Sequence, residues 1–357
     1  MGITHPKYRV AVVQAAPEFL DLDAGIDKTI RLIDEAGKAG AKLIAFPETW
    51  IPGYPWWIWM GSPAWAIQRG FVQRYFDNSL SADSPQAQRL LDAVRRNGMH
   101  AVIGVSERDG SSLYIAQWIL GPAGEWIARR RKLRPTHAER TVFGEGDGSD
   151  LAVHATAIGR LGALNCWENI LSLVKCSMFA QNEQVHVASW PSFSTYEPFA
   201  HALGWQTNNA VSKVYAVEGA CFVLAPCAVI SQAMVDELCD TPDKHELTHV
   251  GGGHAVIYGP DGAALCEKIP EDQEGILYAD IDLGMVGVAK AAMDPCGHYS
   301  RPDVLRLVHN RARQRPVEIV QGMGRAELLT PGETALDGVP SGSLTAPSKG
   351  FQGGGQE

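Results

Sequence analysis

Short runs of apolar residues alternate along this chain with segments whose apolar residues recur at helical spacing. The first run, residues 9–14, is almost wholly apolar and rich in β-branched side chains, as in a strand buried on both faces. In the next segment Ile26, Ile30 and Ile33 are spaced by four and three residues, which predicts a helix. That helix should end near Gly37.

The same alternation continues over most of the sequence. Further apolar runs predict strands at residues 43–46, 101–105, 113–120, 126–131, 161–165, 185–189, 221–225 and 255–257. Helical patterns between the runs predict helices at residues 87–96, 170–181 and 199–218. Strands that alternate with helices and hairpins are typical of a layered α/β fold with a mixed sheet.

The length and composition of the chain indicate the size of its core and its domain organisation. With 357 residues, 45% of them hydrophobic, the chain can bury a sizeable core. No change in composition divides it before the C-terminal region, so we expect a single catalytic domain. From about residue 332 onward the sequence is rich in Gly, Ser, Pro and Gln. Because such a segment cannot bury enough surface to offset its ordering entropy, we predict a mobile tail.

Charge and cysteine content exclude several classes of protein. A net charge of −9 argues against a nucleic-acid partner, because phosphate binding depends on clustered Lys and Arg. No apolar run reaches the roughly 18 residues of a membrane span, and the N-terminus lacks the apolar stretch of a secretion signal. Seven cysteines without a CxxC pair indicate reduced thiols rather than disulfides or a zinc site. We therefore predict a cytoplasmic protein with no metal, no membrane contact and no nucleic-acid partner.

Three chemically active side chains stand at the ends of predicted strands. Glu48 follows the second predicted strand, Lys132 the fifth and Cys166 the sixth. Functional groups of layered α/β proteins gather at the carboxyl ends of strands, where loops are held by a rigid frame. Each residue taken singly also fits a structural role: a capping carboxylate, a lysine of a solvated basic face, or a core thiol. Together, an acid, a base and a thiol form a candidate catalytic set.

The segment around Cys166 is the most specific of the three. A thiol at a sharp strand-to-helix turn is expected to be exposed at the helix N-terminus, where the helix dipole favours thiolate. The backbone N–H of Trp167 would then lie beside the sulfur and stabilise negative charge on an attacked group. The segment lacks the Gly-x-Ser-x-Gly pattern of α/β-hydrolases. A Cys–His pair stays open, since none of the 11 histidines is selected by a local signature.

Five segments resemble signature regions of one enzyme family. They are Phe46-Pro47-Glu48, residues 131–140, residues 164–169, residues 251–262 and residues 294–303. In this order and at these spacings they are similar to segments of the nitrilase branch of the carbon–nitrogen hydrolase superfamily. The resemblance spans roughly residues 8–310. We accordingly expect a catalytic domain over residues 1–310, and a C-terminal extension over residues 311–357 with an interface segment before the tail.

The resemblance implies a fold, an assembly and four site residues. The fold is an α-β-β-α sandwich with mixed β-sheets, in which the subunits pair as a homodimer. Such dimers often extend into a larger homo-oligomer or a spiral filament. Glu48 is implied as the base, Lys132 as the electrostatic partner and Cys166 as the nucleophile. Glu139 matches a second glutamate that supports Lys132 and positions the substrate.

Residues near these four are candidates for the substrate pocket. Family similarity makes Tyr54 a pocket wall, and Trp190, which follows a predicted strand, is a second candidate. Glu168 lies two residues past the cysteine and His137 five past the lysine, so both are expected near the substrate, although His137 also fits a structural role. The other aromatic residues that follow Glu48 are mostly assigned to the core or to an interface. They are Trp50, Trp56, Trp57, Trp59 and Trp65.

The expected chemistry is hydrolysis of a nitrile without a cofactor. A thiolate suits the weakly electrophilic nitrile carbon, and the reaction would pass through a covalent thioimidate and a thioester to a carboxylic acid and ammonia. An aromatic pocket favours an organic nitrile, such as an aryl-aliphatic one, over free cyanide. Three alternatives stay open: a cyanide-degrading enzyme, an amidase of the same superfamily, and a non-catalytic scaffold that forms filaments. Trp167 and Glu168, with residues 251–255, favour a nitrilase over an amidase.

Overall fold

The computed structural model describes residues 2, 4–195, 199–314, 319–321 and 324–326. The chain divides into two compact units, Met1–Arg315 and Pro316–Glu357. The predicted tail from about residue 332 lies outside the described residues. In the second unit, β13 (Ile319–Gln321) and β14 (Gly324–Ala326) form an antiparallel pair.

The larger sheet of the first unit has seven strands within the described residues. β1, β2 and β3 are parallel, whereas β4 is antiparallel to both β3 and β5, so β2 and β5 run in the same direction. Across the sheet the strands are β10 (Cys227–Ala228), β1 (Lys7–Ala15), β2 (Ala41–Ala45), β3 (His100–Asp109), β4 (Ser112–Leu120) and β5 (Trp126–Arg131), with β12 (Gly275–Asp282) also paired to β1.

The smaller sheet has five strands in the described part of the chain. Its central strands β9, β8 and β7 are parallel, and the two edge strands are antiparallel to their neighbours. In order they are β11 (Val256–Tyr258), β9 (Phe222–Ala225), β8 (Val185–Ser189), β7 (Gly159–Asn165) and β6 (His154–Thr156).

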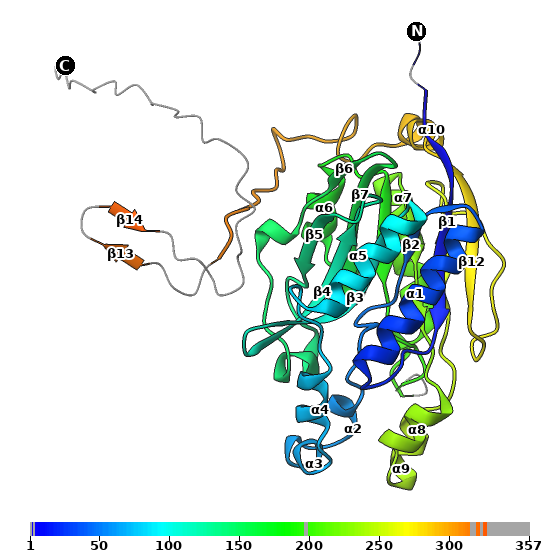
Figure 1. Ribbon diagram of the computed structural model, residues 1–357. Helices are drawn as coiled ribbons and strands as arrows, with labels where there is room; N and C mark the ends of the chain where they lie inside the picture. The colour runs from blue at the N-terminus through cyan, green and yellow to red at the C-terminus, as the bar shows by residue number, and fades with distance from the viewer. Residues whose placement is uncertain (1, 3, 196–198, 315–318, 322–323, 327–357) are drawn as a thin grey trace. The chain divides into compact units, whose positions relative to one another are not determined.

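Helices cover the outer face of each sheet (Figure 1). α1 (Leu22–Lys38) and α5 (Pro85–Asn97) lie side by side on the larger sheet, and α6 (Ser172–Phe179) and α7 (Trp205–Gly219) pack on the smaller one. The two sheets face each other through a shared apolar core. The predicted α-β-β-α sandwich with mixed sheets is therefore confirmed.

The first strand shows why its sequence is apolar throughout. Successive side chains of a strand point to opposite faces. Val10 and Val12 belong to the core between the sheets, whereas Ala11 and Val13 pack in the core beneath α1 and α5. Both faces of β1 are thus buried, as its continuous apolar run predicts.

Shorter elements in the connecting segments were not predicted. The predicted helix at residues 199–218 begins later, after a 3-10 turn, and the one at 170–181 is shorter at both ends. The additional helices are α2 (Trp57–Met60), α3 (Pro63–Gln68), α4 (Phe71–Asp77), α8 (Gln232–Leu238), α9 (Pro242–Leu247) and α10 (Gly284–Ala292). The 3-10 turns are η1 (His137–Thr141), η2 (Gly148–Asp150), η3 (Cys166–Ile170) and η4 (His201–Leu203). Among the described residues, none of the helices has the length and apolar character needed to cross a membrane.

Candidate active site

The three strand ends singled out in the sequence meet at one edge of the sandwich. Glu48 follows β2, Lys132 follows β5 and Cys166 follows β7. Hydrogen bonds between the sheets hold these ends together: Ser189 Oγ donates to the Phe46 carbonyl at 2.9 Å, and Gln117 Nε2 donates to the Leu164 carbonyl at 3.2 Å. The loops that carry the glutamate and the cysteine are therefore tied to the facing sheet.

The Lys132 ammonium lies between two carboxylates. Its Nζ is 2.9 Å from Glu48 Oε1 and 2.7 Å from Glu139 Oε2, and all three side chains are buried. Glu139 has further donors, because Tyr54 Oη donates to its Oε1 at 2.8 Å and the Thr136 N–H donates to its Oε2 at 2.6 Å. In contrast, Glu48 Oε2 has no hydrogen-bond partner among the described residues. This oxygen is free to take a proton.

Burial and charge set the pKa values of these groups. Burial raises the pKa of Glu48 to about 8; Lys132 opposes the rise and the Glu139 carboxylate adds to it. Burial by itself lowers the pKa of Lys132, but the carboxylates of Glu139 and Glu48 outweigh it and raise that pKa above its ordinary value. The ammonium therefore keeps its charge, while Glu48 is a stronger base than an exposed glutamate.

Cys166 occupies a tight turn rather than the exposed end of a helix. It begins η3, a five-residue 3-10 turn, and its side chain is only 9% exposed. Burial is the main cause that raises the pKa of its thiol, with Glu48 adding to the rise and Lys132 and the Trp167 N–H lowering it. The expectation of an exposed, thiolate-favouring cysteine is thus wrong, because desolvation exceeds the effect of a short turn. The thiol stays protonated until a base removes its proton.

Backbone strain accompanies these groups. Cys166 has φ 46°, Thr49 beside Glu48 has φ 43°, and His137, two residues before Glu139, also has φ 43°. A residue with a Cβ in this left-handed region costs roughly 1–2 kcal/mol. Such strain persists only where the surrounding structure holds the residue in place, and it is concentrated at functional sites.

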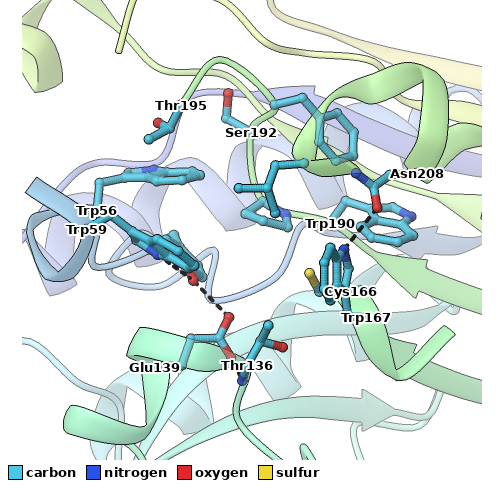
Figure 2. A pocket seen from close by; sticks show the side chains of 14 residues that line it. Trp56, Trp59, Thr136, Glu139, Cys166, Trp167, Trp190, Ser192, Thr195 and Asn208 are labelled. Carbon is cyan, nitrogen blue, oxygen red and sulfur yellow. Dashed lines mark hydrogen bonds between the residues drawn. The ribbon is translucent and has the colours of Figure 1, made fainter. Parts of the chain in front are cut away.

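A pocket with an aromatic wall opens onto the Cys166 sulfur (Figure 2). Cys166 and Glu139 line it, whereas Glu48 and Lys132 lie behind them and are not among the described residues of the lining. Trp167 Nε1 donates to Asn208 Oδ1 at 3.1 Å, which holds the indole against one side. The aromatic lining residues are Tyr54, Trp56, Trp59, Trp167, Trp190 and Phe193, and polar ones include Thr136, Ser192 and Thr195.

Several pocket residues differ from the sequence-based expectation. Tyr54 and Trp190 line the pocket as predicted. Trp56 and Trp59 line it too, although the aromatic block was mostly assigned to the core or an interface. Trp50 does lie in the core, where its Nε1 donates to Thr29 Oγ1 at 2.8 Å. The sequence places these aromatic residues in one block, and only the fold separates pocket from core.

His137 and Glu168 are not among the described residues that line the pocket. The His137 ring stacks on Trp59, with ring centroids 5.2 Å apart, and so supports a wall from behind. Glu168 is buried in an ion pair with Arg130 at 2.7 Å, and its two oxygens also accept the N–H groups of Leu133 and Asn165. The prediction that Glu168 contacts the substrate is therefore corrected. Each of its carboxylate oxygens already accepts one hydrogen bond from Arg130 and one from a backbone N–H group.

Comparison with known proteins agrees with this geometry. The sequence model of the carbon-nitrogen hydrolase family matches residues 9–291. The chain belongs to this family. It is 57% identical to a nitrilase from Pseudomonas syringae pv. syringae (strain B728a) over 302 residues, which cover 85% of this chain and 89% of that protein. It is 47% identical to an aliphatic nitrilase from Rhodococcus rhodochrous, covering 93% and 91% of the two chains.

Further relatives of this carbon–nitrogen hydrolase extend the comparison. An arylacetone-specific nitrilase from Alcaligenes faecalis is 46% identical and covers 87% of this chain and 86% of its own. These relatives confirm the resemblance to the nitrilase branch. Among solved structures, the NitFhit protein of C. elegans superposes with a TM-score of 0.66 at 16% identity, over 91% of this chain and 72% of that one. A carbon–nitrogen hydrolase from Helicobacter pylori G27 gives 0.64 at 16% identity, over 84% and 97%. At such identities the structures support the shared fold alone.

Basic residues of this carbon–nitrogen hydrolase are clustered at Arg129, Arg130, Arg131, Lys132 and Arg134. Arg130, Arg131, Lys132 and Arg134 pair with acidic side chains of the same chain. Arg130 pairs with Glu168, and Arg131 lies 2.6 Å from both Glu107 and Asp109. Arg134 lies 3.4 Å from Glu145. These acidic partners account for the basic run without a nucleic-acid partner. Within the described residues, no group of three or more His, Cys, Asp and Glu side chains is placed to hold a metal ion.

Proposed function

We propose that this hydrolase converts an organic nitrile and water to a carboxylic acid and ammonia, with Cys166 as the nucleophile. The observation that carries the proposal is the Lys132 ammonium held between Glu48 and Glu139 beside a pocket thiol. An ammonium, a carboxylate with a free oxygen and a thiol are the groups that addition to a carbon–nitrogen triple bond requires. The names of the relatives, which are nitrilases, support the same substrate class.

The first step forms a covalent thioimidate. Glu48 Oε2 takes the thiol proton as the Cys166 sulfur attacks the nitrile carbon. One bond of the triple bond becomes a lone pair on nitrogen, and this negative charge is stabilised by Lys132 and the Trp167 N–H. Glu48 then gives the proton to that nitrogen. Because the pKa of the thiol is raised, sulfur attack and proton transfer are expected to be coupled.

Two water molecules complete the reaction. Glu48 deprotonates the first, which adds to the thioimidate carbon and forms a tetrahedral intermediate. Ammonia leaves and a thioester remains on Cys166; the second water hydrolyses it to the acid and restores the thiol. If the tetrahedral intermediate expels the sulfur instead, the product is an amide. Glu139 is held by Tyr54 and Thr136, and it keeps Lys132 in place during both the formation and the hydrolysis of the covalent intermediate.

The pocket favours an apolar organic substituent on the nitrile. Its wall is mainly aromatic, and aromatic side chains contribute large contact areas to an apolar ligand. Free cyanide would leave this wall without a contact. The relatives named aliphatic and arylacetone-specific nitrilases act on substrates with such substituents, and we place the substrate of this chain in the same broad class.

We further propose a cytoplasmic homo-oligomer whose catalytic domain spans residues 1–310, with residues 311–357 as an extension that helps assembly into a larger oligomer or spiral filament. All seven cysteines are free, which suits a reducing compartment. Exposed apolar side chains on η3, α6 and α7 offer a surface for a second copy. This α6/α7 face comprises Ile170, Leu173, Val214 and Val217, which are 40–71% exposed.

Turnover with trapping of the intermediate tests the function. The protein is incubated with phenylacetonitrile, an aliphatic nitrile, cyanide and the matching amides, and ammonia release is measured. Samples quenched during turnover are digested and analysed by mass spectrometry. We expect ammonia and acid from the organic nitriles and an acyl adduct on the Cys166 peptide. Cys166→Ala should lose at least about 10³-fold in turnover, whereas Cys176→Ala, at an exposed cysteine, should not change it.

Other outcomes would indicate a different function or a different nucleophile. Ammonia from the amides alone would mean an amidase, and ammonia or formate from cyanide alone would mean a cyanide-degrading enzyme. No turnover of any substrate by a folded parent protein would favour the scaffold alternative. An adduct on a different cysteine would remove Cys166 from the mechanism.

A further inference from the structure

A buried line of polar side chains ends on the backbone of Cys166. Tyr215 Oη donates to Glu183 Oε2 at 2.6 Å, and Glu183 Oε1 lies 2.7 Å from His186 Nδ1. His186 Nε2 lies 2.8 Å from Asn169 Oδ1, and Asn169 Nδ2 donates to the Cys166 carbonyl at 2.8 Å. We propose that Glu183, His186 and Asn169 form a positioning relay that holds the Cys166 backbone so that its sulfur faces the pocket; this rests on the role proposed above for Cys166.

The direction of the hydrogen bonds follows from the donors and acceptors available. Because the amide Nδ2 of Asn169 faces a carbonyl, its Oδ1 faces His186 and must accept from Nε2–H. The second ring nitrogen of His186 faces a carboxyl oxygen of Glu183, so one proton lies between those two atoms. Each member therefore has a defined partner on both sides. A fully satisfied buried network of this kind keeps its side chains in one arrangement.

The packing around the relay is equally specific. The ring of His186 stacks on Tyr215, with centroids 3.8 Å apart and planes at 21°. Gly162, the β7 residue paired with His186, leaves the space that Glu183 fills, since a Cβ there would lie 1.9 Å from Glu183 Oε1. The relay side chains are fully buried and are not among the described pocket-lining residues. The shortest contact of the relay with the proposed catalytic groups is the bond from Asn169 Nδ2 to the Cys166 carbonyl; the same nitrogen lies 3.4 Å from the Leu164 carbonyl.

Cys166 is the residue that needs such support. Its φ of 46° is one that residues with a Cβ rarely adopt. A right-handed helical turn such as η3 does not impose it, because residues in such turns have negative φ. The bond from Asn169 holds the carbonyl of this same residue. If that bond is lost, the peptide can rotate toward an unstrained conformation, which would carry the sulfur away from Glu48 and the pocket. Such a displacement of about 1 Å can cost about 100-fold in rate.

Asn169→Leu tests the relay, because it keeps the volume of the side chain and removes the bond to the Cys166 carbonyl. Two readouts are taken: nitrile kinetics, and the rate at which iodoacetamide alkylates the Cys166 peptide, followed by mass spectrometry. We expect kcat to fall about 10- to 100-fold with KM changed less than about two-fold. The alkylation rate of Cys166 should fall by a similar factor. The exposed Cys176 peptide of the same sample should be alkylated at the parent rate.

Two further variants separate positioning from general stability. His186→Gln can still donate to Asn169 Oδ1 and should lose less activity than His186→Leu, which cannot. Thr29→Val removes from α1 a buried hydroxyl that contacts Trp50 and does not contact Cys166, and it should lower the thermal midpoint without changing Cys166 alkylation. Should Asn169→Leu fail to fold by circular dichroism, Asn169→Ala, which adds no bulk, takes its place.

The outcomes distinguish the relay from the proposed function. Cys166 alkylation in folded Asn169→Leu within two-fold of the parent rate would overturn the relay, and so would equal losses in His186→Gln and His186→Leu. If the parent protein hydrolyses no nitrile, the proposed function fails, yet the alkylation rates still decide the relay by themselves.

Discussion

At the scale of single residues, the site combines a neutral thiol with an unusually basic carboxylate. Burial raises the pKa of both Cys166 and Glu48, so each is less ready to ionise than in water. Among the residues that the structure describes, Lys132 is the one positive charge that contacts Glu48, and its second carboxylate partner, Glu139, helps to keep it charged. The proposed transfer of a proton from the Cys166 sulfur to Glu48 Oε2 is thus between two groups whose pKa values are both raised.

The raised pKa of Glu48 predicts the pH dependence of the reaction. In its proposed role as the base, Glu48 acts only when it is ionised. A pKa raised to about 8 means that the ionised form is lost as the pH falls through about 8. We expect kcat/KM to level off above that pH and to fall towards tenfold per unit below it. The pKa values of Cys166 and Lys132 are raised as well. Loss of a proton from either group should therefore not lower kcat/KM at pH values just above 8.

Initial rates with phenylacetonitrile at low concentration, measured from pH 6 to 10, test this dependence. Stability at each pH is checked by returning samples to pH 8.5 and assaying them again. Glu48→Gln, which cannot ionise, should be inactive at every pH. A kcat/KM that stays level down to pH 6 would show that Glu48 is not the base, or that its pKa is not raised in the free protein.

At the scale of secondary-structure elements, Glu168 joins the two loops that carry Lys132 and Cys166. Its carboxylate accepts the N–H of Leu133, at 2.7 Å, and the N–H of Asn165, at 2.9 Å. Burial raises the pKa of Glu168, but Arg130 outweighs it and holds the pKa below its ordinary value. A permanent carboxylate therefore connects η3 to the segment that follows β5. The Glu168–Arg130 ion pair therefore contributes to the placement of both the lysine and the thiol.

Glu168→Gln should weaken both the fold and the site. The substitution keeps the shape but leaves the buried Arg130 guanidinium without a counter-charge, which costs on the order of 3–5 kcal/mol. Urea unfolding monitored by tryptophan fluorescence measures the loss, and kcat should fall as well because both loops are loosened. Asp280→Asn, which removes the exposed pair with Arg9, is the control and should barely move the midpoint. Equal midpoints for Glu168→Gln and the parent would contradict the role of this pair.

At the scale of the whole molecule, the α6/α7 face is the surface proposed for a second copy. Leu173 is 71% exposed on α6, and Val214 and Val217 are 46% and 45% exposed on α7. Apolar side chains gathered on one face are typical of a subunit interface. The face also adjoins η3, so that pairing there would cover the back of the turn that carries the proposed nucleophile Cys166.

Leu173→Glu should prevent this pairing, because it puts a charge into an apolar contact. Size-exclusion chromatography with light scattering is expected to give a dimer or larger species for the parent and a monomer for the variant. Gln88→Glu, which adds the same charge on α5, should leave the oligomer unchanged. A variant with the parent mass would place the interface elsewhere, and a monomeric parent would remove the proposed assembly.

Much of the sandwich followed from apolar periodicity. β1, β2 and β7 contain buried apolar runs, at residues 10–13, 43–45 and 161–164, which make these strands easy to predict. β12 was missed because its buried residues, Leu277, Ala279 and Ile281, alternate with half-buried or exposed ones, so that it has no continuous buried run; it pairs with β1 along its whole length. The short helices α2, α3 and α4 carry too few residues for a helical period to be recognised.

The amino-acid sequence by itself determined the layers and the chemical groups at their edge, because burial on two faces and the choice of acid, base and thiol are local properties of the chain. The sequence could not determine the pKa values of the site residues or which side chains contact one another. Only the tertiary structure decided that burial raises the pKa of the Cys166 thiol, that Glu168 faces Arg130 rather than the pocket, and that Trp56 borders the pocket while Trp50 lies in the core. These outcomes depend on desolvation and on neighbours distant in the sequence, which exist only once the two sheets have packed together.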